Sequence, residues 1–294
     1  SGKSMTIEPN ATEHIWLIDS HVHLYRCFQP AEFLSAAYQN LHAAANHLGY
    51  TRNFSGLLLL TETGADAAFE QLRGRSGQPT DPTDPHWQGW RFDTIASDPG
   101  SLIAENPAGN RLWIIAGRQI ITAEKLEVLA LLTDSRFDDG QPLEKCLDMV
   151  RHHGAVPVLP WGAGKWWGER GRLLSRLLHR GMSTPFYLGD NGGRPGLWRR
   201  PRHFREALQA GIPILPGSDP LPLSWEARRV GSRGFALTAA AEPTTPGHAL
   251  RARLRDSALQ FQSFGKPLDS GHFILNQVAL RMYKQHSARR MADA

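Results

Sequence analysis

The stretch IWLIDSHVHLYRC, residues 15–27, begins as an apolar run and then places an acid and two imidazoles at alternate positions. A short run such as residues 15–19 is typical of a strand buried on both faces. Side chains at positions i, i+2 and i+4 of a strand share one face, so Asp19, His21 and His23 are expected to point together. In a barrel, they would point together into its mouth.

Six further apolar runs follow, and helical patterns lie between most of them. The runs cover residues 55–61, 111–117, 126–132, 155–160, 185–189 and 212–217. The helical patterns cover residues 30–48, 142–153, 170–180 and 202–210. Strands that alternate with helices indicate βα units and a parallel sheet. We therefore predict an α/β fold, a distorted (β/α)7 TIM-like barrel that is closed or nearly closed.

Residues 74–110 interrupt this alternation, because they are rich in Pro, Gly and Asp. They contain WRFDTIAS and SLIAEN, which are expected to pair as a hairpin across Asp98-Pro99-Gly100. We interpret the segment as an insertion over one end of the barrel. Residues 271–290 have a helical pattern that becomes basic toward its end. One barrel domain over residues 5–294 is the predicted organisation.

Composition narrows the class of protein and of partner. The chain has 294 residues, 41% hydrophobic and 21% charged, which is typical of a globular protein with a sizeable core. The net charge of +5 is spread out, so it fits a solvated surface, or more specifically an anionic small-molecule substrate. The sequence contains no basic stripe interleaved with aromatics, which is the pattern that would indicate nucleic-acid binding. Two cysteines are too few for a disulfide framework. No apolar run approaches the ~18 residues that a membrane-spanning helix needs. With no signal peptide before the first strand, we predict a cytoplasmic protein without a membrane segment.

Polar side chains follow nearly every predicted strand. In parallel α/β barrels, chemistry takes place at these carboxyl ends. The strand-end residues are Asp19, His21 and His23, then Thr61–Thr63, Arg118 and Gln119, Trp161 and Lys165, Asp190, Asn191 and Arg194, and finally Ser218 and Asp219.

Two histidines at i and i+2 suit a divalent metal, because imidazole binds zinc, manganese or iron and carboxylates complete the shell. The alternative is a strand-end pair with ordinary hydrogen bonds. Asp219, on the last predicted strand, strengthens the metal hypothesis. A bound metal would acidify a water and polarise a phosphoryl or carbonyl oxygen.

The pattern of strand ends resembles the PHP (polymerase and histidinol phosphatase) superfamily, which is related to the amidohydrolases. The resemblance is carried by the HVH motif at residues 21–23 and by the Ser218-Asp219 pair, and it spans roughly residues 15–219. It implies a seven-stranded barrel and a metal-dependent hydrolase. The implied ligands that survive are His21, His23, Glu62 and Asp219, with Asp190 as a further candidate.

This chain departs from the family pattern at several strand ends. Gly117-Arg118-Gln119 puts a neutral amide where a bridging carboxylate is expected, and Pro160-Trp161 replaces a His-Pro pair. Ser218-Asp219-Pro220-Leu221 lacks the closing histidine. The surviving set supports one divalent metal, zinc, manganese or iron, and not a trinuclear centre.

The residues that replace the missing ligands suggest how substrate is bound. Arg118, Lys165 and Arg194 would orient an anionic group, since Arg and Lys bind phosphate and carboxylate well. Gln119 and Trp161 would lie at the same mouth. The alternative for the loop WGAGKWWGERG, residues 161–171, is a surface loop anchored by tryptophans.

Two functional hypotheses follow. The first is a single-metal hydrolase of a phosphorylated or otherwise anionic small molecule, in which Asp219 or Asp190 acts as general base. The second is a degenerate, metal-free barrel that binds a small molecule or serves as a scaffold. A role in nucleic-acid processing rests on the high pI and family analogy alone.

Overall fold

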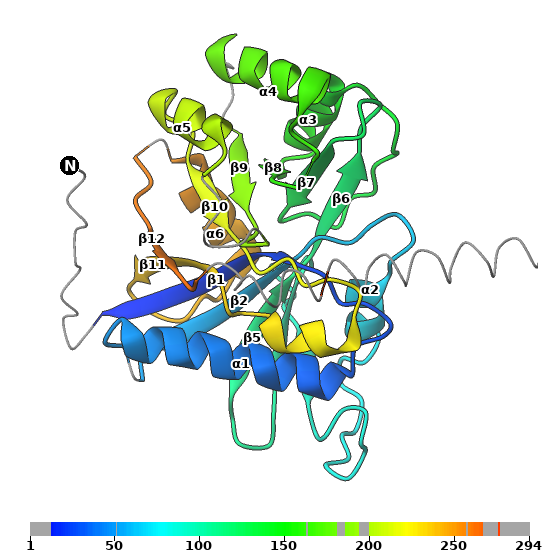
Figure 1. Ribbon diagram of the computed structural model, residues 1–294. Coiled ribbons are helices and arrows are strands. Elements are labelled where there is room, and N and C mark those ends of the chain that lie inside the picture. The colour runs from blue at the N-terminus through cyan, green and yellow to red at the C-terminus, as the bar shows by residue number, and fades with distance from the viewer. Residues whose placement is uncertain are drawn as a thin grey trace, which may run out of the picture.

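The computed structural model describes residues 13–50, 52–162, 164–180, 186–193, 200–256, 258–266 and Asn276. It confirms the α/β class: strands and helices alternate, and the strands form two mixed sheets (Figure 1). All seven predicted strands are present within a few residues of their expected bounds. The four predicted helices are present as well, whereas residues 271–290 lie outside the described part except for Asn276.

The first sheet has seven strands in the order β12-β11-β1-β2-β5-β4-β3. Strands β1, β2 and β5 are parallel, and the others join them antiparallel. In chain order the strands are β1 (His14–Val22), β2 (Phe54–Leu60), β3 (Arg91–Thr94), β4 (Ser101–Glu105), β5 (Arg111–Ile115), β11 (Gly234–Ala239) and β12 (Gln262–Phe264).

The second sheet has five strands in the order β10-β9-β8-β7-β6. Strands β8, β9 and β10 are parallel, and β6 and β7 are antiparallel to their neighbours. The strands are β6 (Gly117–Ile121), β7 (Glu127–Leu131), β8 (Val156–Pro160), β9 (Tyr187–Asp190) and β10 (Ile214–Pro216).

The predicted barrel is not one closed sheet, because both sheets of the described residues are open. The reason lies in how β1 and β2 are paired. Residues 14–18 of β1 pair with β11, and residues 56–59 of β2 pair with β5. Only the ends of β1 and β2 are left to meet the second sheet. One seam is the isolated bridge between Glu62 and Arg118, and the other joins the end of β1 to the end of β10.

Buried side chains explain why the strands read as continuous apolar runs. Along β1, Ile15 and Leu17 face one hydrophobic cluster together with helix α1, whereas Trp16 and Ile18 face another. The second of these clusters also contains residues of β7, β8 and β11, so it fills the space between the two sheets. Both faces of β1 are therefore removed from water, as in a parallel sheet covered on both sides.

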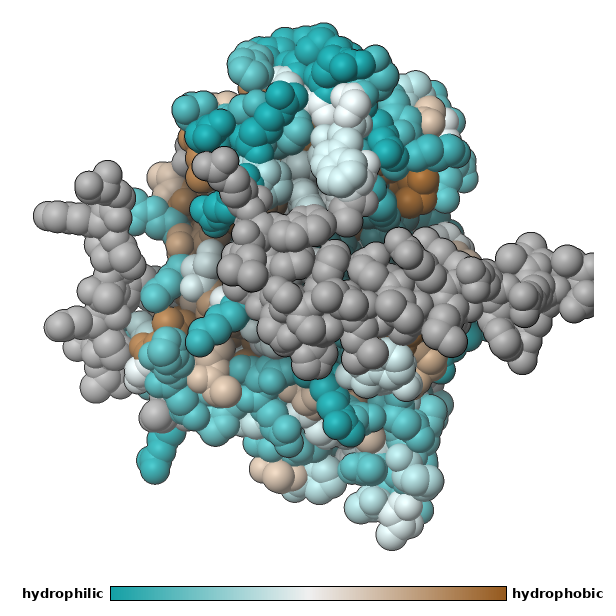
Figure 2. Space-filling view, in the orientation of Figure 1, coloured by the Kyte–Doolittle hydropathy of each residue, from teal (hydrophilic) through white to brown (hydrophobic). Residues whose placement is uncertain are grey.

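Helices cover the outer faces of both sheets (Figure 1). α1 packs against β1 and β2, and α3, α4 and α5 pack around the second sheet. The surface over α4 and α5 is largely hydrophilic (Figure 2). The helices are α1 (Pro30–His47), α2 (Ala68–Arg73), α3 (Leu143–His152), α4 (Gly168–Arg180), α5 (Arg202–Gln209) and α6 (Pro246–Arg255), with the 3₁₀ helix η1 (Ser224–Arg229). None of the described helices is long and apolar enough to cross a bilayer.

The hairpin expected within residues 74–110 is confirmed. β3 and β4 pair antiparallel, and β4 continues the first sheet beside β5. Its turn contains Asp98, which is buried and accepts hydrogen bonds from the backbone N–H of Gly247 at 2.6 Å and from the Ser101 hydroxyl at 3.0 Å. Gly247 lies in the first turn of α6, so a side chain from the hairpin satisfies a helix N–H that has no partner within the helix.

A candidate metal centre

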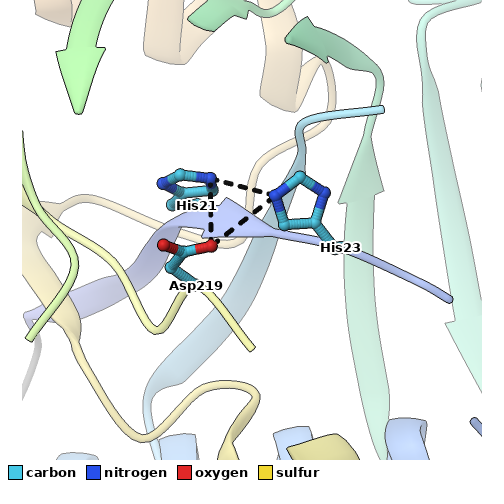
Figure 3. Close-up of side chains that lie close together, drawn as sticks. All are labelled: His21, His23 and Asp219. Carbon is cyan, nitrogen blue, oxygen red and sulfur yellow. Dashed lines mark hydrogen bonds and ion pairs between the residues drawn. The ribbon is translucent and has the colours of Figure 1, made fainter. Parts of the chain in front are cut away.

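Three potential metal ligands converge where the two sheets meet at the ends of β1 and β10. His21 lies near the end of β1, His23 directly follows that strand, and Asp219 follows β10 (Figure 3). The two Nε2 atoms are 3.1 Å apart, and Oδ1 of Asp219 lies 3.4 Å from His21 Nε2 and 3.6 Å from His23 Nε2. His21 and His23 are buried, and Asp219 is partly exposed. The three residues form a candidate metal-binding group.

The size of this triangle fits a divalent cation. Zinc bound tetrahedrally at about 2.0–2.1 Å holds its ligand atoms roughly 3.3 Å apart. The three separations, 3.1, 3.4 and 3.6 Å, lie around that value. The ligand types also fit a divalent cation, because two imidazoles and one carboxylate are typical ligands of zinc and of non-haem iron. The residues present therefore fit one metal ion.

The electrostatics of the triad also suit a metal. Burial lowers the pKa of His23 to about 4, and neighbouring His21 adds to this effect. His23 is therefore neutral near pH 7, which leaves a nitrogen lone pair for a cation. Burial acts to raise the pKa of Asp219, but His21, His23, the hydrogen bond from Asn191 and the charge of Arg229 together hold this pKa below its usual range. A carboxylate and a neutral imidazole are the forms that bind metal.

Asp19 is not part of this group, although alternation along β1 predicted that it would point together with the two histidines. The register between β1 and β2 shifts between Asp19 and Val22, so alternation does not continue through this part of the strand. Asp19 is fully buried and accepts hydrogen bonds from the backbone N–H groups of Ser218 and Gly231, each at 2.8 Å. It thus ties β1 to the residue next to Asp219. Burial raises the pKa of Asp19 to about 6, against the effect of these hydrogen bonds.

The backbone at Asp219 is strained and firmly held. Its φ of 42° lies in the left-handed region, which non-glycine residues seldom adopt. Its N–H donates to the carbonyl of His21 at 2.8 Å, and its Oδ2 accepts from Asn191 Nδ2 at 2.6 Å. Asn191 also donates to the carbonyl of Trp161 at 2.9 Å. Asn191 therefore orients the carboxylate whose other oxygen faces the histidines.

A network around buried Glu226 supports the same loop. Glu226 accepts hydrogen bonds from the backbone N–H of Leu221 at 3.2 Å and from Arg229 at 2.7 Å. Arg229 donates in turn to the carbonyl of Ser218 at 2.9 Å. The other oxygen of Glu226 accepts from Asn276 Nδ2 at 2.9 Å, and both residues are buried. Asn276 is thus connected, through Glu226, to the loop that carries Asp219.

Glu62, a predicted ligand, and Arg118, a predicted substrate-binding residue, are paired with each other. Arg118 donates to Glu62 Oε2 at 2.6 Å, and Glu62 Oε1 accepts from the backbone N–H of Phe69 at 2.7 Å. Both side chains are buried. Burial raises the pKa of Glu62, and Arg118 opposes this shift. Glu62 is not among the residues whose ligand atoms lie within 4.8 Å of one another.

Asp190, a predicted general base, is buried beside Arg233. Its Oδ2 accepts from Arg233 at 2.8 Å, and its Oδ1 accepts from the backbone N–H of Gly192 at 3.2 Å. The carboxylate is one residue before Asn191 and is directed to different partners. The described contacts therefore give it a part in fixing the loop after β9.

The remaining predicted substrate-binding residues are spread over several environments. Lys165 forms an ion pair with Glu127, and Trp161 is buried in the core of the second sheet. Gln119 is half-buried, and its backbone N–H donates to the carbonyl of Glu62 at 2.8 Å. Arg194 lies outside the described residues.

Comparison with known structures supports the fold. The crystal structure of PsfC from Pseudomonas syringae PB-5123 is similar, with a TM-score of 0.51 and 17% sequence identity over 94% of this chain and 99% of that chain. The lesion-specific endonuclease PfuEndoQ from Pyrococcus furiosus has a TM-score of 0.42 and 11% identity, over 76% of this chain and 52% of that chain. No family model and no curated protein matches the sequence. The likeness to PsfC extends over both chains and indicates a shared fold alone.

Several residues that shape the centre were not assigned a role from the sequence. Arg229 and Glu226 occur in SWEARR, which has no motif that marks them. Tyr25, in the opening stretch, stacks on His23 with ring centroids 5.1 Å apart. Its position two residues after His23 was the available signal.

Proposed function

We propose that the protein is a metal-dependent hydrolase that acts on a phosphorylated or otherwise anionic small molecule. The observation that carries this proposal is the convergence of His21, His23 and Asp219, with ligand atoms 3.1 to 3.6 Å apart. The sequence resemblance to the PHP superfamily supports the reaction type. One divalent ion, zinc, manganese or iron, is the proposed cofactor.

When bound, such an ion supplies an acidified water and polarises an oxygen of the substrate. His21 and His23 would bind it as neutral imidazoles, and Asp219 as a carboxylate. Asn191 keeps that carboxylate turned toward the histidines through its 2.6 Å hydrogen bond. Asp219 is the better placed of the two proposed general bases, because it is partly exposed within the triad, whereas Asp190 is buried against Arg233.

A metal-free binding or scaffolding protein is the second candidate. It is favoured by the pairing of Glu62 with Arg118, because an acid expected to serve as a metal ligand neutralises a buried arginine instead. The pairing of Lys165 with Glu127 similarly reduces the net positive charge available to an anionic substrate. In this alternative, the His-His-Asp group would be a hydrogen-bonded remnant.

The two candidates are separated by metal content. We would purify the protein without chelators and measure bound metals by elemental mass spectrometry, beside His21→Ala/His23→Ala. The variant His152→Ala/His153→Ala is the matched control, because it removes two exposed histidines at the end of α3. About one equivalent of metal, lost only in the first variant, is expected. Assays with aryl phosphates, amides and lactones then define the reaction.

Absence of metal from all three proteins, together with no uptake on titration with zinc, manganese or iron, would remove the hydrolase. The metal-free binding protein would then be the function that remains. Equal metal content in both double variants would place the ion elsewhere in the chain.

A further inference from the structure

We propose that a pocket beside the metal centre binds a planar aromatic ring of the substrate. This inference rests on the proposed function, because it assigns the pocket to the group attached to the reacting anion. The pocket has a volume of about 280 Å³ and is formed by the residues after β1, the start of α2 and part of the insertion. This volume is just below the ~300–1,000 Å³ of typical ligand sites, so it suits one ring system.

The walls of the pocket are mainly aromatic and aliphatic. Tyr25, Phe28, Leu72 and Trp87 contribute to them. The Tyr25 and Phe28 rings meet edge to face, with centroids 5.4 Å apart and planes at 85°. A ring bound among such side chains can make the offset or edge contacts that aromatic pairs prefer.

Tyr25 connects the pocket to the metal centre. Its ring is stacked on that of His23, with centroids 5.1 Å apart and planes at 20°. One aromatic ring thus separates a candidate metal ligand from the pocket. Asp66, four residues after Glu62, also lines the pocket. A ring in the pocket and an anion at the metal can therefore belong to one molecule.

Trp87 is held as a fixed wall. The guanidinium of Arg75 lies 4.2 Å from the centre of its ring, and Phe92 contacts it edge to face with centroids 5.5 Å apart. These contacts restrict the indole before any ligand binds, which lowers the entropy that binding must overcome.

The pocket also has a cation suited to an anionic ligand. Arg26 lines it, is exposed, and forms no ion pair with any residue in the described part of the chain. Its guanidinium can contact a phosphate or carboxylate without breaking an existing pair. An aromatic ring joined to an anionic group, such as an aryl phosphate ester, is therefore the ligand class that fits.

Binding of two phosphonates tests the inference without requiring turnover. Phenylphosphonate and methylphosphonate carry the same anion, and only the first carries a ring. We would measure their affinities for the zinc-loaded protein by calorimetry. We expect phenylphosphonate to bind about 10- to 100-fold more tightly, as burial of one aromatic ring implies.

Two substitutions on α2 test whether the phenyl ring of phenylphosphonate binds in this pocket. Gln71→Trp places a large side chain at a residue that lines the pocket, and Glu70→Trp places it at a neighbour that does not. The preference for phenylphosphonate should be lost in Gln71→Trp and kept in Glu70→Trp. If Gln71→Trp does not fold, Ala67→Phe provides a second way to fill the pocket.

The outcomes distinguish this inference from the proposed function. Equal affinity for the two phosphonates, or an unchanged preference in Gln71→Trp, would overturn the ring pocket even in a protein that binds zinc. If no zinc binds, the same comparison is made with metal-free protein. A ring preference that Gln71→Trp removes would then sustain the pocket although the hydrolase has failed.

Discussion

The backbone N–H of Asp219 donates a hydrogen bond of 2.8 Å to the carbonyl of His21. Two candidate ligands from distant parts of the sequence are therefore fixed to each other by the main chain as well as by their side chains. The main-chain bond fixes the separation of the two backbones, and the side-chain contact places the metal-binding atoms 3.4 Å apart. A cation would find these two ligands already in place, which favours tight and specific binding.

Asn191 is expected to control metal affinity without being a ligand. Asn191→Ala removes the 2.6 Å hydrogen bond that orients Asp219, and loss of such an outer partner typically costs 10- to 100-fold in affinity. Competition titration with a zinc indicator measures this change. Asn46→Ala, at an exposed position of α1, is the control and should bind zinc as the wild type does. Equal affinities in the two variants would contradict the assignment.

Glu62 and Arg118 are expected to stabilise the fold as a pair rather than to hold the metal. Glu62→Leu leaves the buried charge of Arg118 without its partner, which should lower the free energy of unfolding by about 3–5 kcal/mol. The double variant Glu62→Leu/Arg118→Met should recover most of that loss. Urea unfolding of the wild type, both single variants and the double variant gives the coupling energy. Loss of metal from the double variant would instead identify Glu62 as a ligand.

Asn276 is expected to affect the metal centre from a distance. Asn276→Ala leaves one oxygen of buried Glu226 without the hydrogen bond it accepts at 2.9 Å, which should cost about 1–3 kcal/mol of stability. Because Glu226 and Arg229 hold Leu221 and Ser218, on either side of Asp219, zinc affinity should also fall. Asn276→Asp places a second carboxylate against Glu226 and should be worse. If both variants lose stability but keep wild-type zinc affinity, the network does not support the ligand.

Acid should destabilise the protein partly through His203. This residue is buried, its Nε2 lies 3.0 Å from the carbonyl of Gly171, and burial lowers its pKa. The unfolded chain therefore takes up a proton at higher pH than the folded protein, so stability falls as pH drops below about 6.5. In chelator-treated protein, His203→Gln should show a shallower fall in the free energy of unfolding between pH 7 and pH 5. Parallel pH profiles for the two proteins would rule out this contribution.

Patterns among neighbouring residues were sufficient to predict most strands and helices. Residues 15–18 and 57–60 are apolar throughout because both faces of β1 and β2 are buried, so their sequences identify them as strands. Pro30 marks the first turn of α1, where its missing N–H is not required. The histidines at 21 and 23 could be assigned to one site because only Val22 separates them.

Relations between distant segments could not be predicted in the same way. β11 pairs with β1 over residues 14–18, so this edge of β1 is not available to the second sheet. The strands therefore do not form a continuous ring. The register shift after Asp19 gives that acid different partners from the histidines. Glu62 and Arg118 each had a plausible separate role, and only the packing of β2 against β6 shows that they neutralise one another.

The contact between Asp98 and Gly247 has a consequence for engineering this chain. The insertion of residues 74–110 has the sequence of a replaceable surface module, but its hairpin turn completes the N-terminus of α6, 149 residues away. A shortened or grafted hairpin that lacks an acceptor at this position would expose the start of that helix to fraying. Any transplant of the insertion must therefore bring Asp98 with it or supply a new cap within residues 244–246.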